Sequence, residues 1–225
     1  MNPLGIDVNI YWWIFFGTAV VIGGAVIAQR YFDKKRREAL AQLALRIGCS
    51  FSPKDPGLLS GSSLGRCPLF NLGQSRKANN VLRGSQGKTE TIVFDYRYTI
   101  GCGEHIQTFR QTVAARQSPA PIAEFQLRPK RFFDGLARLF GRTQIEISTD
   151  TKFSSQYQLR GPDEMSVRRM FRPDVLALFN NKPGWSVEST GDWLIAYRRN
   201  KQIPPELFTS FMESTRTIAS LFFAS

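Results

Sequence analysis

The chain opens with a long apolar run that changes at once into a basic segment. Residues 8–29, VNIYWWIFFGTAVVIGGAVIAQ, contain no charged side chain, whereas residues 30–37, RYFDKKRR, contain five Lys or Arg. At about 1.5 Å per residue, a helix of this length crosses a hydrocarbon core of about 30 Å. The pattern therefore predicts a tail and transmembrane anchor over residues 1–32. A cleaved signal peptide would carry basic residues before its apolar run, and here they follow it.

The flanking charges predict the orientation of this anchor. Lys and Arg beside a span stay on the cytoplasmic side, and Asp7 is the only charge before the run. The N-terminus is therefore expected outside and the rest of the chain in the cytoplasm. Leu40, Leu43, Ala44 and Ile47 recur at helical spacing, so residues 33–48 are expected to form a basic juxtamembrane helix that continues the anchor.

Beyond residue 49 the pattern changes to short strands with turns between them. Residues 49–73 are rich in Gly, Ser and Pro and are expected to be a loop, with room for a short strand or a turn of helix, whose apolar side chains fold onto a core. Residues 89–100 alternate with period two and are expected to pair with residues 105–115 as a hairpin. Further strands are predicted over residues 124–127, 141–148 and 153–159, and a second hairpin over residues 185–188 and 193–199.

Helical segments separate and follow these strands. A helix is expected from Pro162 with an interruption at Pro173, and a last amphipathic helix follows Pro204. Groups of strands each followed by helix indicate an α+β fold with antiparallel strands packed against amphipathic helices. Residues 49–225 are expected to form this cytoplasmic α+β domain, either as one unit or as two subdomains with a boundary near residues 141–161.

The charge balance favours an anionic neighbour. Thirty Lys and Arg against eighteen Asp and Glu give a formal charge of +12. For an anchored domain the nearest anionic surface is the lipid itself, whereas nucleic acid is not held within a Debye length and is the less favoured partner.

Residues suited to catalysis are few. His105 is the only histidine, and Cys49, Cys67 and Cys102 are too dispersed for a metal site, so neither a metal nor a cofactor is expected. An enzyme that uses Cys102 or His105 is a weaker hypothesis than a non-catalytic adaptor or a module that senses anionic lipid. Asp95 and Arg97 share a strand face and are expected to form a salt bridge.

One basic segment has amphipathic character. Residues 128–142, RPKRFFDGLARLFGR, place aromatic and aliphatic residues on one helical face and arginines around it. This face either packs on the sheet or lies on the membrane surface, and the pattern leaves both open. The candidate membrane-surface residues are Lys34, Lys35, Arg36, Arg37, Arg128, Lys130, Arg131, Phe132, Phe133, Arg138 and Arg142.

The order of several segments carries a resemblance. VFDYRYT, QTV, the P-x-x-x-F-x-L-x-P pattern of residues 121–129, FSSQYQLRGPDE and VRRMFRPDVL follow one another along the chain. Together they resemble an uncharacterised family of bacterial single-pass inner-membrane proteins. The resemblance implies an inner-membrane location and no activity. The sequence thus predicts an anchored, non-catalytic adaptor or accessory subunit with an unknown protein partner, or alternatively a module that senses anionic lipid.

Overall fold

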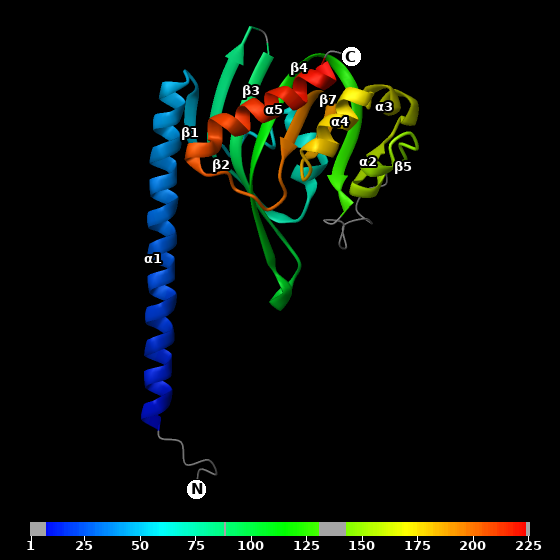
Figure 1. The fold of residues 1–225 in the computed structure, drawn as a ribbon. Helices are drawn as coiled ribbons and strands as arrows, with labels where there is room; N and C mark the ends of the chain where they lie inside the picture. The colour runs from blue at the N-terminus through cyan, green and yellow to red at the C-terminus, as the bar shows by residue number, and fades with distance from the viewer. Residues whose placement is uncertain (1–7, 88, 131–142, 224–225) are drawn as a thin grey trace, which may run out of the picture.

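The computed structural model describes residues 8–87, 89–130 and 143–223. Its first element is one continuous helix, α1 (Val8–Arg46), of 39 residues and therefore about 58 Å in length. Figure 1 shows the rest of the molecule packed beside the C-terminal part of this helix only. Trp13 and Ile27 on the free part are 78% and 70% exposed, whereas Leu40 and Ala44 near the C-terminal end are fully buried. Ile47, predicted on the same apolar face, lies beyond the helix and is exposed.

The remaining elements form the α+β region of the chain, residues 49–223. Its strands are β1 (Ser50–Lys54), β2 (Gln74–Gln86), β3 (Thr89–Ile100), β4 (Gln107–Pro129), β5 (Thr143–Ile145), β6 (Tyr157–Gly161) and β7 (Ser186–Tyr197). Its helices are α2 (Thr151–Gln156), α3 (Glu164–Met170), α4 (Pro173–Asn181) and α5 (Phe208–Phe223), with short 3-10 turns η1 (Ser63–Arg66), η2 (Pro68–Asn71), η3 (Gly103–His105) and η6 (Pro205–Leu207).

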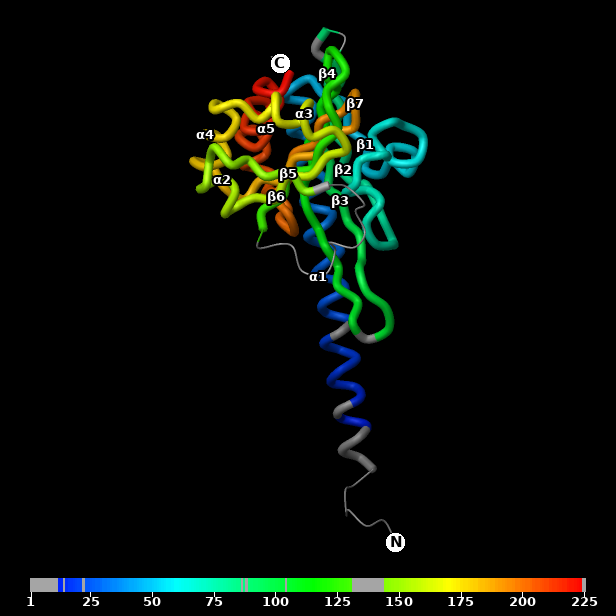
Figure 2. The backbone as a smooth tube through the Cα atoms, turned by 90° about the vertical axis from the view of Figure 1, so that its right-hand side faces the viewer, coloured from blue at the N-terminus to red at the C-terminus, as the bar shows by residue number. Residues whose placement is uncertain are grey.

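All seven strands belong to one antiparallel sheet, which confirms the predicted α+β fold. The order is β1-β2-β3-β4-β6-β5, and β7 pairs with the other edge of β4. The first half of β4 pairs with β3 and its last residues pair with β6, so this long strand joins the two parts of the sheet. The β3–β4 hairpin was predicted, and Figures 1 and 2 show its tip reaching to the level of the middle of α1, although Figure 1 shows the tip apart from that helix.

The two faces of the sheet bury two separate hydrophobic clusters. On one face α1 and the helices α2 to α5 cover Val93, Ala114 and Phe125. On the other face the segment with η1 and η2 covers Phe94 and Tyr96, among others. The loop predicted over residues 49–73 therefore does fold onto a core.

The second predicted hairpin is wrong, because residues 186–197 form the single strand β7. The expected turn, residues 189–192, lies opposite an irregular stretch of β4 where the register shifts between Gln117 and Ile122 and again before Phe125. Gly191 has φ of +79°, which a glycine adopts without strain. The turn-forming residues are thus accommodated by a bulge in the partner strand instead of reversing the chain.

The strand predicted over residues 153–159 is also partly wrong. Its first half is the helix α2, which begins because the Asp150 carboxylate accepts a hydrogen bond from the backbone N–H of Phe153 at 2.9 Å. Only Tyr157 and the residues after it pair as a strand. The predicted interruption before Pro173 is confirmed, since α3 ends at Met170 and α4 begins at Pro173.

Candidate functional site

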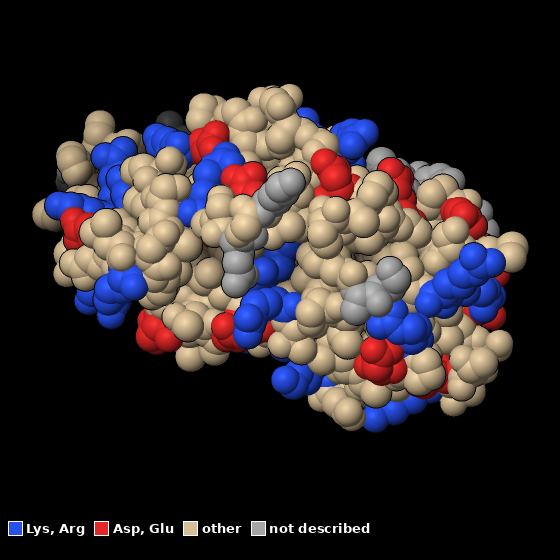
Figure 3. All heavy atoms as spheres, turned by 90° about the horizontal axis from the view of Figure 1, so that it is seen from above, with Lys and Arg blue, Asp and Glu red and all other residues tan. Residues whose placement is uncertain are grey.

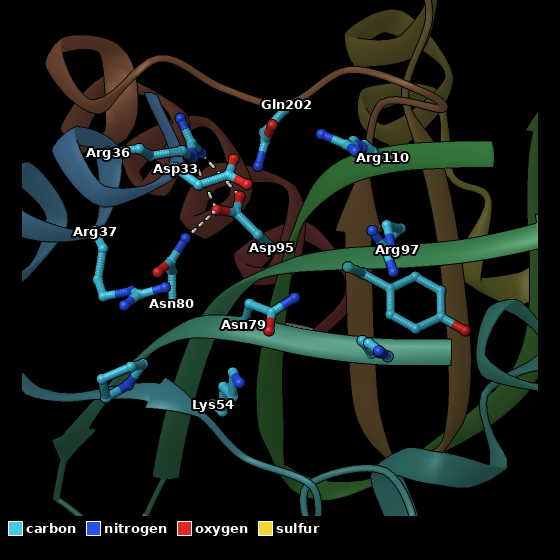
Figure 4. Close-up of a pocket in the computed structure, with 13 residues that line it drawn as sticks. Asp33, Arg36, Arg37, Lys54, Asn79, Asn80, Asp95, Arg97, Arg110 and Gln202 are labelled. Carbon is cyan, nitrogen blue, oxygen red and sulfur yellow. Dashed lines mark hydrogen bonds and ion pairs between the residues drawn. The ribbon is translucent and has the colours of Figure 1, made fainter. Parts of the chain in front are cut away.

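A basic cavity lies where α1 passes the edge of the sheet. It has a volume of about 260 Å³, and its walls come from α1, from β1 to β4 and from the segment before α5 (Figure 4). Six basic side chains and two acidic ones line it. They are Arg36, Arg37, Lys54, Lys77, Arg97 and Arg110, against Asp33 and Asp95. The cavity therefore carries a formal excess of four positive charges.

The Asp95 carboxylate holds α1 to the sheet. Arg36 donates from Nε and Nη2 to the two carboxylate oxygens, each at 2.8 Å, and Figure 4 shows these bonds at the wall of the cavity. Asn80 and Thr112 donate at 2.9 Å and 3.0 Å. Both ionic side chains are largely buried, with 14% of Arg36 and 6% of Asp95 exposed. The charges of Arg36 and Asp95 thus cancel, and Asp95 has four hydrogen bonds.

The predicted salt bridge between Asp95 and Arg97 is wrong, because α1 supplies the cation instead. The neighbouring row of the sheet holds a line of cations. Lys77 of β2 lies opposite Arg97 of β3, and Arg97 lies opposite Arg110 of β4. Within the described residues none of these three side chains has an acidic partner, and the buried Nε of Arg97 has no hydrogen bond. Like charges directly opposite one another on neighbouring strands are destabilising.

Arg37 and Lys54 add two further cations to the same cavity from α1 and β1. Both are exposed, and neither has an acidic partner among the residues that the structure describes. Asp33 accepts a hydrogen bond from Gln29 on the preceding turn of α1. The cations of Arg37, Lys54, Lys77, Arg97 and Arg110 are hereafter called the unpaired cations. An adjoining cavity of about 690 Å³ shares Lys54 and Lys77 with the first.

Of the residues predicted from sequence as membrane-surface contacts, Arg36 and Arg37 are the two among the described ones that line the cavity. Lys34 and Lys35 are exposed on α1, where Lys34 Nζ lies 3.9 Å from Glu38. Arg128 is corrected, because it lies in strand β4 instead of on a helical face. Lys130 is exposed, and residues 131–142, including Phe132 and Phe133, lie outside the described residues.

Arg128 belongs to a second buried ionic cluster on the other face of the sheet. Its Nη2 donates to Glu188 Oε1 at 2.8 Å, and Glu188 is fully buried. Glu188 also accepts from Gln126, from the Tyr197 hydroxyl and from the backbone N–H of Leu69 in η2. Burial by itself disfavours the guanidinium charge, but Tyr197 and Glu188 raise the pKa of Arg128 above its ordinary value. Every charge in this cluster is matched by a partner.

The residues of the enzymatic hypothesis lie at the tip of the β3–β4 hairpin. Cys102 and His105 are both exposed there, joined by a backbone hydrogen bond from His105 N–H to the Cys102 carbonyl at 3.2 Å. No side-chain hydrogen bond joins the two in the described part of the chain. Within that part, no three His, Cys, Asp or Glu side chains gather as metal ligands.

The aromatic side chains of the same hairpin lie on the other face of the sheet from the cations. Tyr96, Tyr98 and Phe109 are stacked on one another and at most 5% exposed. They are therefore covered and do not present rings to a nucleic-acid base. On the face seen in Figure 3, at the end of the molecule away from the free part of α1, Lys and Arg are interspersed with Asp and Glu.

Fold and cavity define a class: an α+β region with a basic cavity, carried on one helix that is long and apolar enough to cross a membrane. No family model and no curated protein matches the chain. Among solved structures, the crystal structure of the mycobacterial trehalose monomycolate transport factor A, TtfA, is similar. The TM-score is 0.59 at 14% identity, over 83% of this chain and 92% of that chain. At this identity the likeness shows a shared fold.

The sequence alone did not identify the cavity as a unit. Lys54, Lys77 and Arg110 stand far apart in the chain and show no motif. The one signal of the cavity in the sequence is the spacing of Asp95 and Arg97, which places both side chains on the same face of one strand. Which residues of the adjacent strands lie beside them depends on the strand register. Register follows from the fold.

Proposed function

We propose that this chain is a single-pass inner-membrane protein whose cytoplasmic α+β region works by binding, as an accessory subunit without catalysis. The continuity of α1 carries the proposal. One helix has an exposed apolar part suited to lipid and a C-terminal part tied to the sheet by Leu40, Ala44 and the Arg36–Asp95 pair. Such a helix would hold the α+β region at a fixed distance from the bilayer. The similar fold of a bacterial transport factor supports an accessory role in membrane transport.

Anchorage and orientation are tested together by cysteine labelling. Cys102 is exposed, Cys67 is buried, and burial raises the pKa of the half-buried Cys49 thiol, so Cys102 should react first. An impermeant maleimide should label Cys102 in inverted membrane vesicles and leave it unlabelled in intact spheroplasts. Cys102→Ser is the control for site assignment. Labelling in intact spheroplasts would contradict the orientation, and release of the chain by alkaline carbonate would contradict the anchor.

The accessory role is tested by in-cell cross-linking of the full chain, mild detergent extraction and mass identification of what is captured. A reproducible integral membrane protein is the expected result. Asp95→Ala removes the carboxylate that ties α1 to the sheet. It should weaken capture if the partner binds the α+β region in one fixed orientation relative to α1. Capture of lipid without any protein would contradict the adaptor role.

A second candidate function is sensing of the anionic membrane surface. The hairpin tip favours it, because it extends to the same level as the free part of α1 and leaves Ile106 53% exposed. Lys34, Lys35, Lys130 and the predicted basic and aromatic residues 131–142 would add to such a contact. Phe132→Ser with Phe133→Ser should abolish salt-sensitive vesicle binding of a fragment without the anchor and leave its fold intact. Loss of fold and binding together would show that the aromatic residues belong to the core.

A further inference from the structure

The unpaired cations are arranged as a binding site for an anion. Lys77, Arg97 and Arg110 form a row across three adjacent strands, and each lies directly opposite the next. Such a row is unfavourable by itself, and an anion bound across it removes the repulsion. Arg36, the remaining cation of the cavity, is already neutralised by Asp95. The excess charge is therefore concentrated on one row and on the two cations beside it.

We infer that this cavity binds a phosphate ester, with Arg97 at the centre of the site and Lys77, Arg110, Arg37 and Lys54 around it. A phosphate offers several acceptor oxygens, and the planar guanidinium fork of arginine matches two of them at once. Within the described residues no protein acceptor is bonded to the Nε–H of Arg97. The amides of Asn79 and Gln202 line the same space and offer neutral donors.

The dimensions of the cavity favour a small head group. A volume of about 260 Å³ is below the usual range of about 300 to 1,000 Å³ for pockets that hold drug-sized ligands. The charged and amide side chains of its lining also suit a phosphate with a short polar substituent better than an acyl chain. Nucleic acid is the weaker alternative, because Tyr96, Tyr98 and Phe109 are buried on the opposite face.

The position of the cavity points to the lipid as the source of this phosphate, and this step rests on the proposed anchorage. Arg36 and Arg37 lie six and seven residues after Arg30, the first charge beyond the apolar run, which is about 9 and 10.5 Å along a helix. This is close to one Debye length at physiological salt. The row of Lys77, Arg97 and Arg110 lies between the Asp95 row and the hairpin tip, which extends to the same level as the free part of α1. The head groups of the cytoplasmic leaflet would then lie within reach.

The test measures lipid and phosphate binding to the full chain in detergent by native mass spectrometry. The lipid probes are phosphatidylglycerol and diacylglycerol, which lacks phosphate, and the soluble probe is glycerol 1-phosphate. The site variant is Lys77→Gln with Arg97→Gln. Its matched control is Lys152→Gln with Arg169→Gln, which removes the same charge from exposed positions of α2 and α3. The site variant should raise the dissociation constant of phosphatidylglycerol roughly tenfold or more, and the control less than about twofold.

Two results support the site and identify its source. If phosphatidylglycerol stays bound in the presence of glycerol 1-phosphate, the ligand of the cavity is a lipid head group. If glycerol 1-phosphate displaces it, the ligand is a free phosphate ester. Equal affinity for diacylglycerol, or equal losses in the two double variants, would overturn the site. If the site variant does not fold, Arg110→Gln alone should weaken binding in the same direction. Should carbonate extraction show that the chain is not anchored, binding of glycerol 1-phosphate still tests the cavity separately.

Discussion

Two buried carboxylates, one on each face of the sheet, differ in the balance of charge around them. Glu188 is fully buried and accepts four hydrogen bonds, one of them from its single cation, Arg128. Asp95 also accepts four hydrogen bonds and is paired with Arg36, yet the next row of the sheet carries three cations that no acid of the described residues matches. A balanced cluster stabilises the fold, whereas an unbalanced one has charge available for a ligand.

The largest expected effect comes from breaking the balanced cluster. Glu188→Ala leaves the Arg128 guanidinium buried without its acid and removes the acceptor of the Leu69 N–H and the Tyr197 hydroxyl. Removal of one partner from a buried ion pair costs about 3 to 5 kcal/mol. The free energy of unfolding, measured with urea on the full chain in detergent, should fall by that amount. Glu206→Ala, at an exposed position, is the control and should change it little. Equal stability of Glu188→Ala and the control would mean that the cluster is not structural.

A smaller loss is expected when Arg36 is replaced. Arg36→Met keeps an unbranched apolar stem but removes the guanidinium and both of its hydrogen bonds to Asp95, which retains those from Asn80 and Thr112. Removal of one partner from a buried ion pair costs about 3 to 5 kcal/mol, and because Asp95 keeps two neutral donors a loss at the lower end, about 3 kcal/mol, is expected. Spin-label distances between α1 and β3 should also broaden, because this pair fixes the helix to the sheet. Unchanged distances together with unchanged stability would remove Arg36 from the tie between helix and sheet.

Tyr197→Phe should cost about 1 kcal/mol at neutral pH, since one neutral donor of Glu188 is lost while Arg128 and Gln126 remain. Its pH dependence is the sharper test. Burial raises the pKa of Tyr197 well above its ordinary value of about 10, and the nearby Glu188 charge adds to this while Arg128 opposes it. The native state therefore keeps the proton when the unfolded chain loses it, so stability falls as the pH rises above about 10.

The variant should lose part of that alkaline decline, measured as the free energy of unfolding against pH. The remaining decline is expected from Tyr96 and Tyr98, whose pKa values burial also raises. An identical alkaline decline in the variant and the parent chain would show that Tyr197 does not contribute to it.

The sequence predicts those features that depend on neighbouring residues. The apolar run, the helix through Leu40 and Ala44 and the hairpin of β3 with β4 follow from composition, period and turn residues close together in the chain. The cavity and both ionic clusters depend on contacts between distant segments. Arg36 and Asp95 are 59 residues apart, and Arg128 and Glu188 are 60 apart. Arg128 was assigned to an amphipathic helix because residues 128–142 as a whole have a helical period of basic and aromatic residues. That period does not tell whether the first residues of the segment are helical or extended.

The smallest effect on stability distinguishes the two carboxylate regions most directly. Arg97→Gln removes the central charge of the unpaired row, so it should stabilise the chain by about 0.2 to 1 kcal/mol in the absence of ligand. The gain should shrink at high salt, where the repulsion of Arg97 with Lys77 and Arg110 in the parent chain is already screened. Phosphatidylglycerol affinity should fall in the same variant, whereas Arg169→Gln should leave both quantities nearly unchanged. If replacement of Arg97 stabilises the fold and weakens binding, the role of Arg97 is to bind the ligand and not to stabilise the fold. A loss of stability in Arg97→Gln would instead give Arg97 a structural role like that of Arg128.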